Sequence, residues 1–152
     1  MMSKIVLLDS GVWAANFLET DVFHRTADRL IVRLLAVQNK ILVPKIVKVE
    51  VLNVVLHRTL EKNQVKFVDD KFNALAPAVE FREGDHMFWD QFVPQQLSRL
   101  FLKTMDFLIA CHALYWEVEA FYSFDEKLNQ ALRRIKPEIV KIKIRRGHVI
   151  EA

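Results

Sequence analysis

Short runs of consecutive apolar residues alternate along the chain with longer segments in which apolar residues recur every three to four positions. An unbroken apolar run is typical of a strand buried on both faces of a sheet, and the longer period is typical of an amphipathic helix. The runs predict strands at residues 4–8, 41–43, 78–81, 120–124 and 140–144. The periodic segments predict helices at residues 20–38, 44–61, 64–75, 85–102 (with an interruption at Pro94), 105–117 and 126–135.

Strands that alternate with helices over the whole length indicate an α/β fold with a mainly parallel sheet and helices on both faces, a three-layer α/β/α arrangement. Only three glycines and four prolines occur in the 152 residues, and no linker, repeat or low-complexity segment is present. We therefore expect residues 1–152 to form one domain. In such sheets, ligands bind beyond the carboxyl ends of the strands, so the chemistry is expected there.

The composition is that of an ordinary soluble protein of a reducing compartment. Cys111 is the only cysteine, which excludes an internal disulfide, and its apolar neighbours predict a buried thiol. The N-terminal apolar run at residues 5–8 is shorter than the roughly seven residues that a signal peptide needs, and no stretch approaches the roughly 20 apolar residues of a membrane span. We expect a cytoplasmic protein.

Four acidic residues stand at positions where folding alone does not readily explain them. Asp9 and Asp125 directly follow the first and fourth predicted strands, so both should project at the same rim of the sheet. Glu50 and Asp106 interrupt helices that are otherwise apolar, where an acid is unfavourable unless it is paired or bound to a metal. The four positions together favour a single site.

Each acid, taken alone, has an ordinary structural explanation. The two aspartates after strands can cap the helices that follow them, and the two helical acids can form salt bridges, for which Lys103 and Arg58 are candidates. As a cluster, however, carboxylates repel one another, and a divalent cation removes that penalty. Hard oxygen ligands select Mg²⁺ or Mn²⁺ over zinc. Such a cation can polarise a phosphoryl oxygen and activate water, which is the chemistry of phosphodiester hydrolysis.

Other chemistries fit the sequence less well. A haloacid-dehalogenase phosphatase needs a second aspartate two residues after the first, where this chain has Gly11. A phospho-receiver domain needs a phospho-acceptor aspartate on the third strand, and none stands there. The sequence has no glycine-rich phosphate loop, and its five histidines show no zinc-binding spacing.

The segments that hold the four acids resemble, in order and spacing, the four motifs of PIN domains: VLLDS at 6–10, PKIVKVEVLNV at 44–54, DFLIACHAL at 106–114 and SFD at 123–125. The resemblance covers residues 4 to about 145 and is strongest to small single-domain members that include the VapC toxins. It implies a five-stranded parallel sheet in the order 3-2-1-4-5. It also implies an endoribonuclease that cleaves single-stranded RNA with Mg²⁺ or Mn²⁺.

The resemblance also assigns roles to individual residues. It implies that Asp9, Asp106 and Asp125 are the principal metal ligands and catalytic residues, and that Glu50 completes the acidic site. Ser10 and Ser123 occupy places where the family uses Ser or Thr to orient ligands or water. A toxin of this kind would have an antitoxin as its partner. The alternative is a catalytically silent PIN fold that binds nucleic acid or serves in assembly, and the intact acid set favours the enzyme.

A basic strip near the C-terminus is a second candidate for RNA contact. Residues 133–146 hold seven basic residues and one acid, and Lys141, Lys143 and Arg145 alternate with apolar residues as on one face of a strand. These cations can bind RNA phosphates, or they can protect an edge strand from aggregation.

We also expect a homodimer. Toxin-like PIN proteins usually pair, and the aromatic residues Phe88, Trp89 and Phe92 look exposed just before Pro94.

Overall fold

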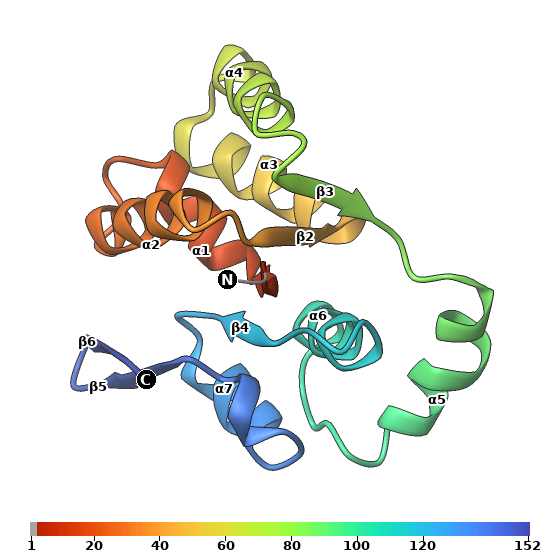
Figure 1. The fold of residues 1–152 in the computed structure, drawn as a ribbon. Coiled ribbons are helices and arrows are strands. Elements are labelled where there is room, and N and C mark those ends of the chain that lie inside the picture. The colour runs from red at the N-terminus through yellow and green to blue at the C-terminus, as the bar shows by residue number, and fades with distance from the viewer. Residues whose placement is uncertain (1–2) are drawn as a thin grey trace.

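A four-stranded parallel sheet forms the centre of the computed structural model, which describes residues 3–152 (Figure 1). The sheet has the order β3-β2-β1-β4, and all its neighbouring strands are parallel. Its strands are β1 (Ile5–Leu8), β2 (Lys40–Pro44), β3 (Val79–Arg82) and β4 (Ala120–Tyr122). The predicted α/β fold and the order of these four strands are confirmed. Residues 1 and 2, which belong to the predicted domain, lie outside the described residues.

Two groups of helices flank the sheet. Helix α1 packs against α2 and α3, α3 packs against α4, and α6 packs against α7. Right-handed crossovers place the two groups on opposite faces, because the chain moves one way through β2 and β3 and returns to the other edge for β4. The helices are α1 (Ser10–Phe17), α2 (His24–Ala36), α3 (Lys45–Thr59), α4 (Lys62–Asn73), α5 (Val93–Gln96), α6 (Thr104–Tyr115) and α7 (Glu126–Arg133).

The core lies on both faces of the sheet, because the central strands are buried on both sides. Val6, Leu7 and Leu8 of β1 are fully buried, as the unbroken apolar run predicts. Cys111 is also fully buried, and burial raises the pKa of its thiol to about 12. This confirms the prediction of a small buried hydrophobic residue rather than a reactive thiol.

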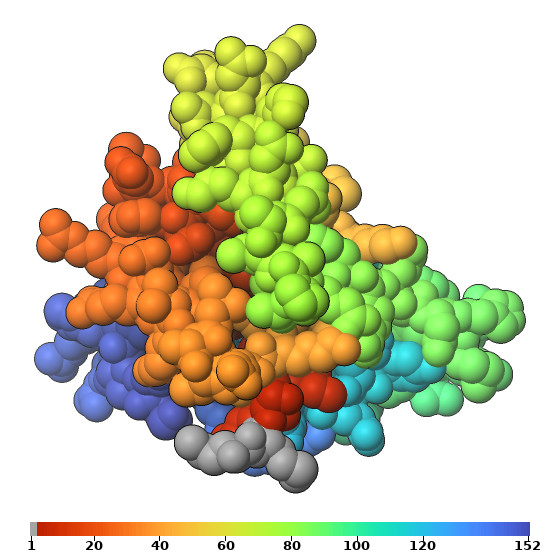
Figure 2. Space-filling view, turned by 45° about the horizontal axis from the view of Figure 1, so that its top comes forward, coloured from red at the N-terminus to blue at the C-terminus, as the bar shows by residue number. Residues whose placement is uncertain are grey.

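Helix α4 lies at the outer edge of the first helix group. It stands out from the body of the molecule in both views, and Figure 1 shows it on the opposite side of the molecule from α7 (Figures 1 and 2). It packs mainly against α3, and its buried Phe72 contacts Trp13 and Phe17 of α1 and Phe81 of β3. No helix within residues 3–152 has the length and apolar character needed to cross a membrane.

The first helix of the chain was not predicted. Helix α1 (Ser10–Phe17) is apolar almost all round and therefore lacks an amphipathic pattern. The predicted helix from residue 20 begins later, at His24, because the Asp21 side chain accepts a hydrogen bond from the backbone of Phe23 in a turn before it. Thr104 is the first residue of α6 rather than its cap, and Lys103 in the cap position offers no side-chain hydrogen bond.

The predicted fifth strand does not join the sheet as a full strand. Val140 forms a single parallel bridge to Phe121, after which β5 (Ile142–Arg145) pairs antiparallel with β6 (His148–Glu151). The physical reason is the two-residue turn Arg146-Gly147, in which both residues have positive φ angles (51° and 75°). Such a turn matches the twist of a hairpin, so the chain folds back on itself rather than ending along β4.

The segment before α6 also differs from the prediction. Pro94 does not interrupt a helix but lies in the first turn of α5, which continues the π-helix η1 (Phe88–Phe92) and ends at Gln96 rather than near residue 102. Phe88 is fully buried, with its ring centroid 4.1 Å from that of His112, and Phe92 is half-buried. The expectation that these aromatic residues are exposed is wrong for Phe88; Trp89, 37% exposed, is the most accessible of the three.

Candidate functional site

All four predicted acids line one pocket at the carboxyl ends of the strands. This acid pocket has a volume of about 630 Å³ and includes side chains from α1, α3, α6 and the turn before α7. The four predicted acids among its lining residues are Asp9, Glu50, Asp106 and Asp125. The structure therefore brings together residues that are up to 116 positions apart in the sequence.

Asp9 is the most buried of the four acids, at 4% exposed. It caps α1, and one of its oxygens accepts hydrogen bonds from the backbone N–H (2.8 Å) and the hydroxyl (3.3 Å) of Ser10. The other oxygen accepts a hydrogen bond from the Ser123 hydroxyl at 2.8 Å. Burial raises the pKa of Asp9 to about 7, the hydrogen bond from Ser123 opposes the rise, and the charges of Asp106 and Glu50 add to it.

Asp125 has both a structural contact and a place in the acid pocket. Its Oδ1 accepts hydrogen bonds from the backbone N–H groups of Lys127 (2.9 Å) and Leu128 (3.3 Å), so it caps α7. Its own backbone N–H donates to the Ser123 hydroxyl at 2.9 Å. The capping explanation is thus correct for Asp9 and Asp125. It does not exclude a further role, because both residues also line the pocket.

Glu50 and Asp106 lack the salt bridges that would explain them structurally. Arg58 pairs with Asp21 instead (2.6 Å), and within residues 3–152 neither Glu50 nor Asp106 forms a salt bridge. Burial raises the pKa of Asp106, the charges of Asp125 and Glu50 raise it further, and Lys103 opposes the rise. The Oε2 atom of Glu50 is buried without any hydrogen-bond partner among the described residues.

Two further acids line the pocket and were not predicted. Asp21 is paired with Arg58, and Glu126 is paired with Arg133 (2.7 Å) and accepts a hydrogen bond from the backbone N–H of Ile144. The position of Glu126 directly after Asp125 indicates in the sequence that it lies near the site. Nothing near Asp21 in the sequence indicates this, because its partner Arg58 is 37 positions away. Asp21 and Glu126 therefore each form an ion pair with an arginine, whereas none of the four predicted acids forms one within residues 3–152.

The donor set of the acid pocket fits a divalent cation that prefers oxygen ligands. Four carboxylates that form no salt bridge with any described residue line a shared space, and one of their oxygens is buried with no hydrogen-bond partner in that part of the chain. Across residues 3–152, no three His, Cys, Asp or Glu side chains stand close enough together to hold a metal ion as they are placed. A cation here would therefore be held by fewer direct protein ligands and by water or phosphate oxygens, as is usual for Mg²⁺.

The basic strip lies outside the acid pocket. Lys143 and Arg145 are exposed on β5, and the Lys141 side chain donates to the backbone carbonyl of Glu138 at 2.9 Å. None of these three cations lines the acid pocket.

Comparisons with known proteins agree with the observed fold. A family model described as the PIN domain matches residues 6–133, and no curated protein matches the sequence. The crystal structure of VapC20 from Mycobacterium tuberculosis, a toxin that cleaves the sarcin-ricin loop, is similar with a TM-score of 0.66 and 18% identity over 83% of this chain and 94% of that one. VapBC2 from Rickettsia felis, bound to a DNA fragment from its promoter, is similar with a TM-score of 0.60 and 17% identity over 90% and 96% of the two chains. At 17–18% identity, the similarity to these two structures shows a shared fold.

Proposed function

The chain belongs to the PIN domain family, and on that premise we propose that it is a metal-dependent endoribonuclease that hydrolyses phosphodiester bonds of single-stranded RNA. The observation that carries the proposal is the convergence of the buried Asp9 with three further acids in one pocket, none of the four forming a salt bridge within residues 3–152. A fold that used these acids only for stability would pair them, as it pairs Asp21 and Glu126 in the same pocket.

In this proposal Asp9, Asp106 and Asp125 would hold Mg²⁺ or Mn²⁺, with fewer than three of them in direct contact as the side chains are placed and the rest bound through water, and Glu50 would complete the acidic site. When bound, the cation would polarise a phosphoryl oxygen and lower the pKa of a water molecule. Ser123 orients Asp9 and is itself fixed by the backbone of Asp125. The backbone N–H and hydroxyl of Ser10 hold the other oxygen of Asp9. The two serines thereby keep the most buried carboxylate in one orientation.

We extend the proposal to partners and surroundings. The R. felis structure contains VapBC2 with promoter DNA, which supports an antitoxin as the partner of this chain and a place in a toxin–antitoxin pair. We propose a homodimer that forms through the exposed surface around Trp89. We also propose that residues 1–152 form a single domain. A cytoplasmic location is proposed as well, and the free thiol of Cys111 supports it. RNA contact by Lys141, Lys143 and Arg145 is proposed as an extension of the site.

The experiment that tests the function is a cleavage assay with purified protein and end-labelled single-stranded RNA. We expect cleavage with Mg²⁺ or Mn²⁺, none in excess EDTA, and recovery when the metal is restored. Asp9→Asn should lose on the order of 100-fold in rate, whereas Asp28→Asn, an exposed acid on α2, should cleave as the wild type does. Near-wild-type cleavage by Asp9→Asn would show that Asp9 only caps α1. RNA binding without cleavage by any preparation would support the silent PIN fold instead.

A further inference from the structure

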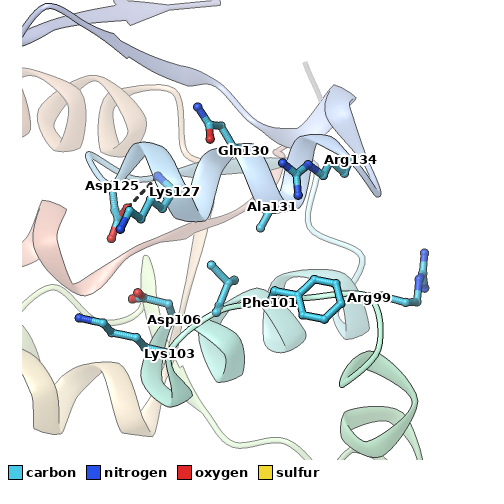
Figure 3. Close-up of a pocket in the computed structure, with 10 residues that line it drawn as sticks. Arg99, Phe101, Lys103, Asp106, Asp125, Lys127, Gln130, Ala131 and Arg134 are labelled. Carbon is cyan, nitrogen blue, oxygen red and sulfur yellow. Dashed lines mark hydrogen bonds between the residues drawn. The ribbon is translucent and has the colours of Figure 1, made fainter.

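A second groove adjoins the acid pocket and shares two of its acids. This basic groove, of about 470 Å³, runs between α7 and the segment that leads into α6 (Figure 3). Asp106 and Asp125 line both hollows, so the basic groove opens at one end into the acid pocket. Its other lining residues are Arg99, Phe101, Leu102, Lys103, Lys127, Gln130, Ala131 and Arg134.

One wall of the basic groove is a single face of α7 and its end. Lys127, Gln130, Ala131 and Arg134 recur at intervals of three and four residues, which places them along one side of a helix. Seven residues of helix separate the two cations by about 10 Å along the axis. Lys127 lies beside Asp125 at the acid end, and Arg134 lies at the other end (Figure 3).

The opposite wall is an extended segment whose side chains alternate. Leu100 is buried and Leu102 is half-buried, whereas Phe101 and Lys103 are exposed, as expected for extended chain with a period of two. Arg99 and Arg134 both lie toward the end away from the acids, and Lys103 lies beside Asp106 at the acid end (Figure 3). The groove therefore has cations on both walls at both ends.

The cations of this groove are available to a ligand. Within residues 3–152, Lys103, Lys127 and Arg134 form no salt bridge with any carboxylate. Arg133, one position before Arg134, is by contrast engaged within the protein. It forms a salt bridge with Glu126 and donates a hydrogen bond to the backbone carbonyl of Ile142. Unpaired cations on both walls of a concave surface attract a polyanion.

The basic groove also contains an exposed aromatic side chain, Phe101. It is 83% exposed, more than most large apolar side chains of this chain, and it lies between the lysine end and the arginine end (Figure 3). An exposed aromatic ring among cations stacks on a nucleic-acid base, and only an unpaired base offers its face.

We propose that the basic groove binds single-stranded RNA, with Lys103, Lys127 and Arg134 on phosphates and Phe101 stacked on an unpaired base, so that the strand continues into the acid pocket. This inference rests on the proposed ribonuclease function, for which it supplies the path of the substrate and the reason for a preference for single strands. Cations hold the strand along the groove, and the acids at its end meet the phosphate to be cut.

The test uses a fluorescein-labelled 12-residue oligouridylate, which has no secondary structure, and fluorescence anisotropy in EDTA over a series of salt concentrations. The groove variant (Lys103→Gln, Lys127→Gln, Arg134→Gln) should lose at least tenfold in affinity and flatten the logarithmic salt slope by about 2, since each phosphate contact on a single strand contributes about 0.7. Its matched control removes three exposed lysines of α4, which loses the same charge at a distant surface: Lys62→Gln, Lys66→Gln and Lys71→Gln. The control should keep both affinity and slope.

The ring is tested separately from the charges. Phe101→Ala should weaken binding on the order of tenfold without changing the salt slope, and Phe101→Trp should bind at least as well as the wild type. Unchanged affinity in Phe101→Ala would overturn the stacking contact and leave the ring as a surface for another protein. Thermal unfolding of every variant shows whether the fold is kept, which is expected because the changed side chains are exposed.

Failure of this inference can be distinguished from failure of the proposed function. If the wild type cleaves RNA with Mn²⁺ and the groove variant binds and cleaves as well as the α4 control, the groove is not the path and the function stands. If the wild type binds RNA through the groove but never cleaves it, the function fails and the groove stands. Weaker binding with a raised KM and a nearly unchanged kcat in the groove variant supports both.

Discussion

The hydroxyl of Ser123 donates a 2.8 Å hydrogen bond to Oδ2 of Asp9 across 114 positions of sequence. The same hydroxyl accepts a hydrogen bond from the backbone N–H of Asp125 at 2.9 Å. Ser123 is fully buried, and its carbonyl accepts a further hydrogen bond from the Asn129 side chain. One buried side chain thus fixes two of the proposed metal ligands relative to each other, after the adjacent strands β1 and β4.

We expect Ser123→Ala to weaken Mn²⁺ binding and to lower kcat by about tenfold or more. The substitution removes the Ser123 hydrogen bond, which is the main cause that lowers the pKa of Asp9, so this carboxyl should hold its proton more tightly. It also leaves a buried oxygen unsatisfied, which costs about 1–3 kcal/mol of stability. Isothermal titration with Mn²⁺ measures the first effect, and Ser98→Ala, at an exposed serine, is the control. Unaltered metal affinity would show that Ser123 serves folding alone.

The pH dependence of metal binding should report Asp9. Because its pKa is raised to about 7, Asp9 is mostly protonated below neutral pH, and a metal ion must displace that proton. Affinity for Mn²⁺ should therefore fall about tenfold for each pH unit below 7 and level off above it. Titrations between pH 5.5 and 8.5 test this. A flat profile in the wild type would mean that Asp9 is not a ligand.

The metal-free protein should lose stability as pH rises, which is the reverse of the usual behaviour of a carboxyl. The folded chain binds the Asp9 proton more tightly than the unfolded chain, whose pKa is 3.8, so this stability is present below about pH 4 and lost by about pH 7. The difference corresponds to on the order of 4 kcal/mol. Urea unfolding in EDTA at pH 5 and pH 8 should therefore show Asp9→Asn gaining on the wild type at the higher pH. Parallel curves for the two proteins would contradict the raised pKa.

Local patterns in the sequence were sufficient to predict most strands of the sheet and the convergence of four acids at one site. An unbroken apolar run identifies β1, and the residue after it, Asp9, must lie at the carboxyl edge of a parallel sheet. An acid inside an apolar helix, such as Glu50, is conspicuous without any knowledge of the fold. Both signals need only a few neighbouring residues.

Features that depend on distant contacts or on all-round burial were not predictable in this way. Helix α1 is apolar on every side and leaves no periodic signal. Phe88 is buried because His112 and Tyr115 of α6 cover it, which nothing near Phe88 in the sequence indicates. The basic groove likewise needs two segments, around Lys103 and Lys127, that come together only in the folded chain. The hairpin of β5 and β6 is different, because its turn at Arg146-Gly147 has a local signal in the glycine that follows the strand.

The homodimer proposal is tested at Trp89. Light scattering should give twice the mass of the 17.8 kDa chain, and Trp89→Glu should shift the protein toward the monomer, because a charge on the exposed ring position opposes burial in an interface. Leu60→Glu, at another exposed apolar residue, is the control. A monomer mass at every concentration of the wild type would refute the dimer.

The basic strip on β5 gives a last prediction that separates RNA binding from protection against aggregation. Changing Lys141, Lys143 and Arg145 together to Gln removes one charged surface without touching the apolar residues between them. Lys143 and Arg145 are exposed, whereas Lys141 is held by the Glu138 carbonyl, so two phosphate contacts are expected and the salt slope of RNA binding should flatten by about 1.4. Metal affinity should not change, because none of the three lines the acid pocket. If the strip only protects a strand edge, the variant will keep the slope and aggregate at lower concentration.

Because the basic groove lies next to the acids and the strip does not, the groove variant should lose more affinity than the strip variant. The reverse order would place the main RNA path along β5.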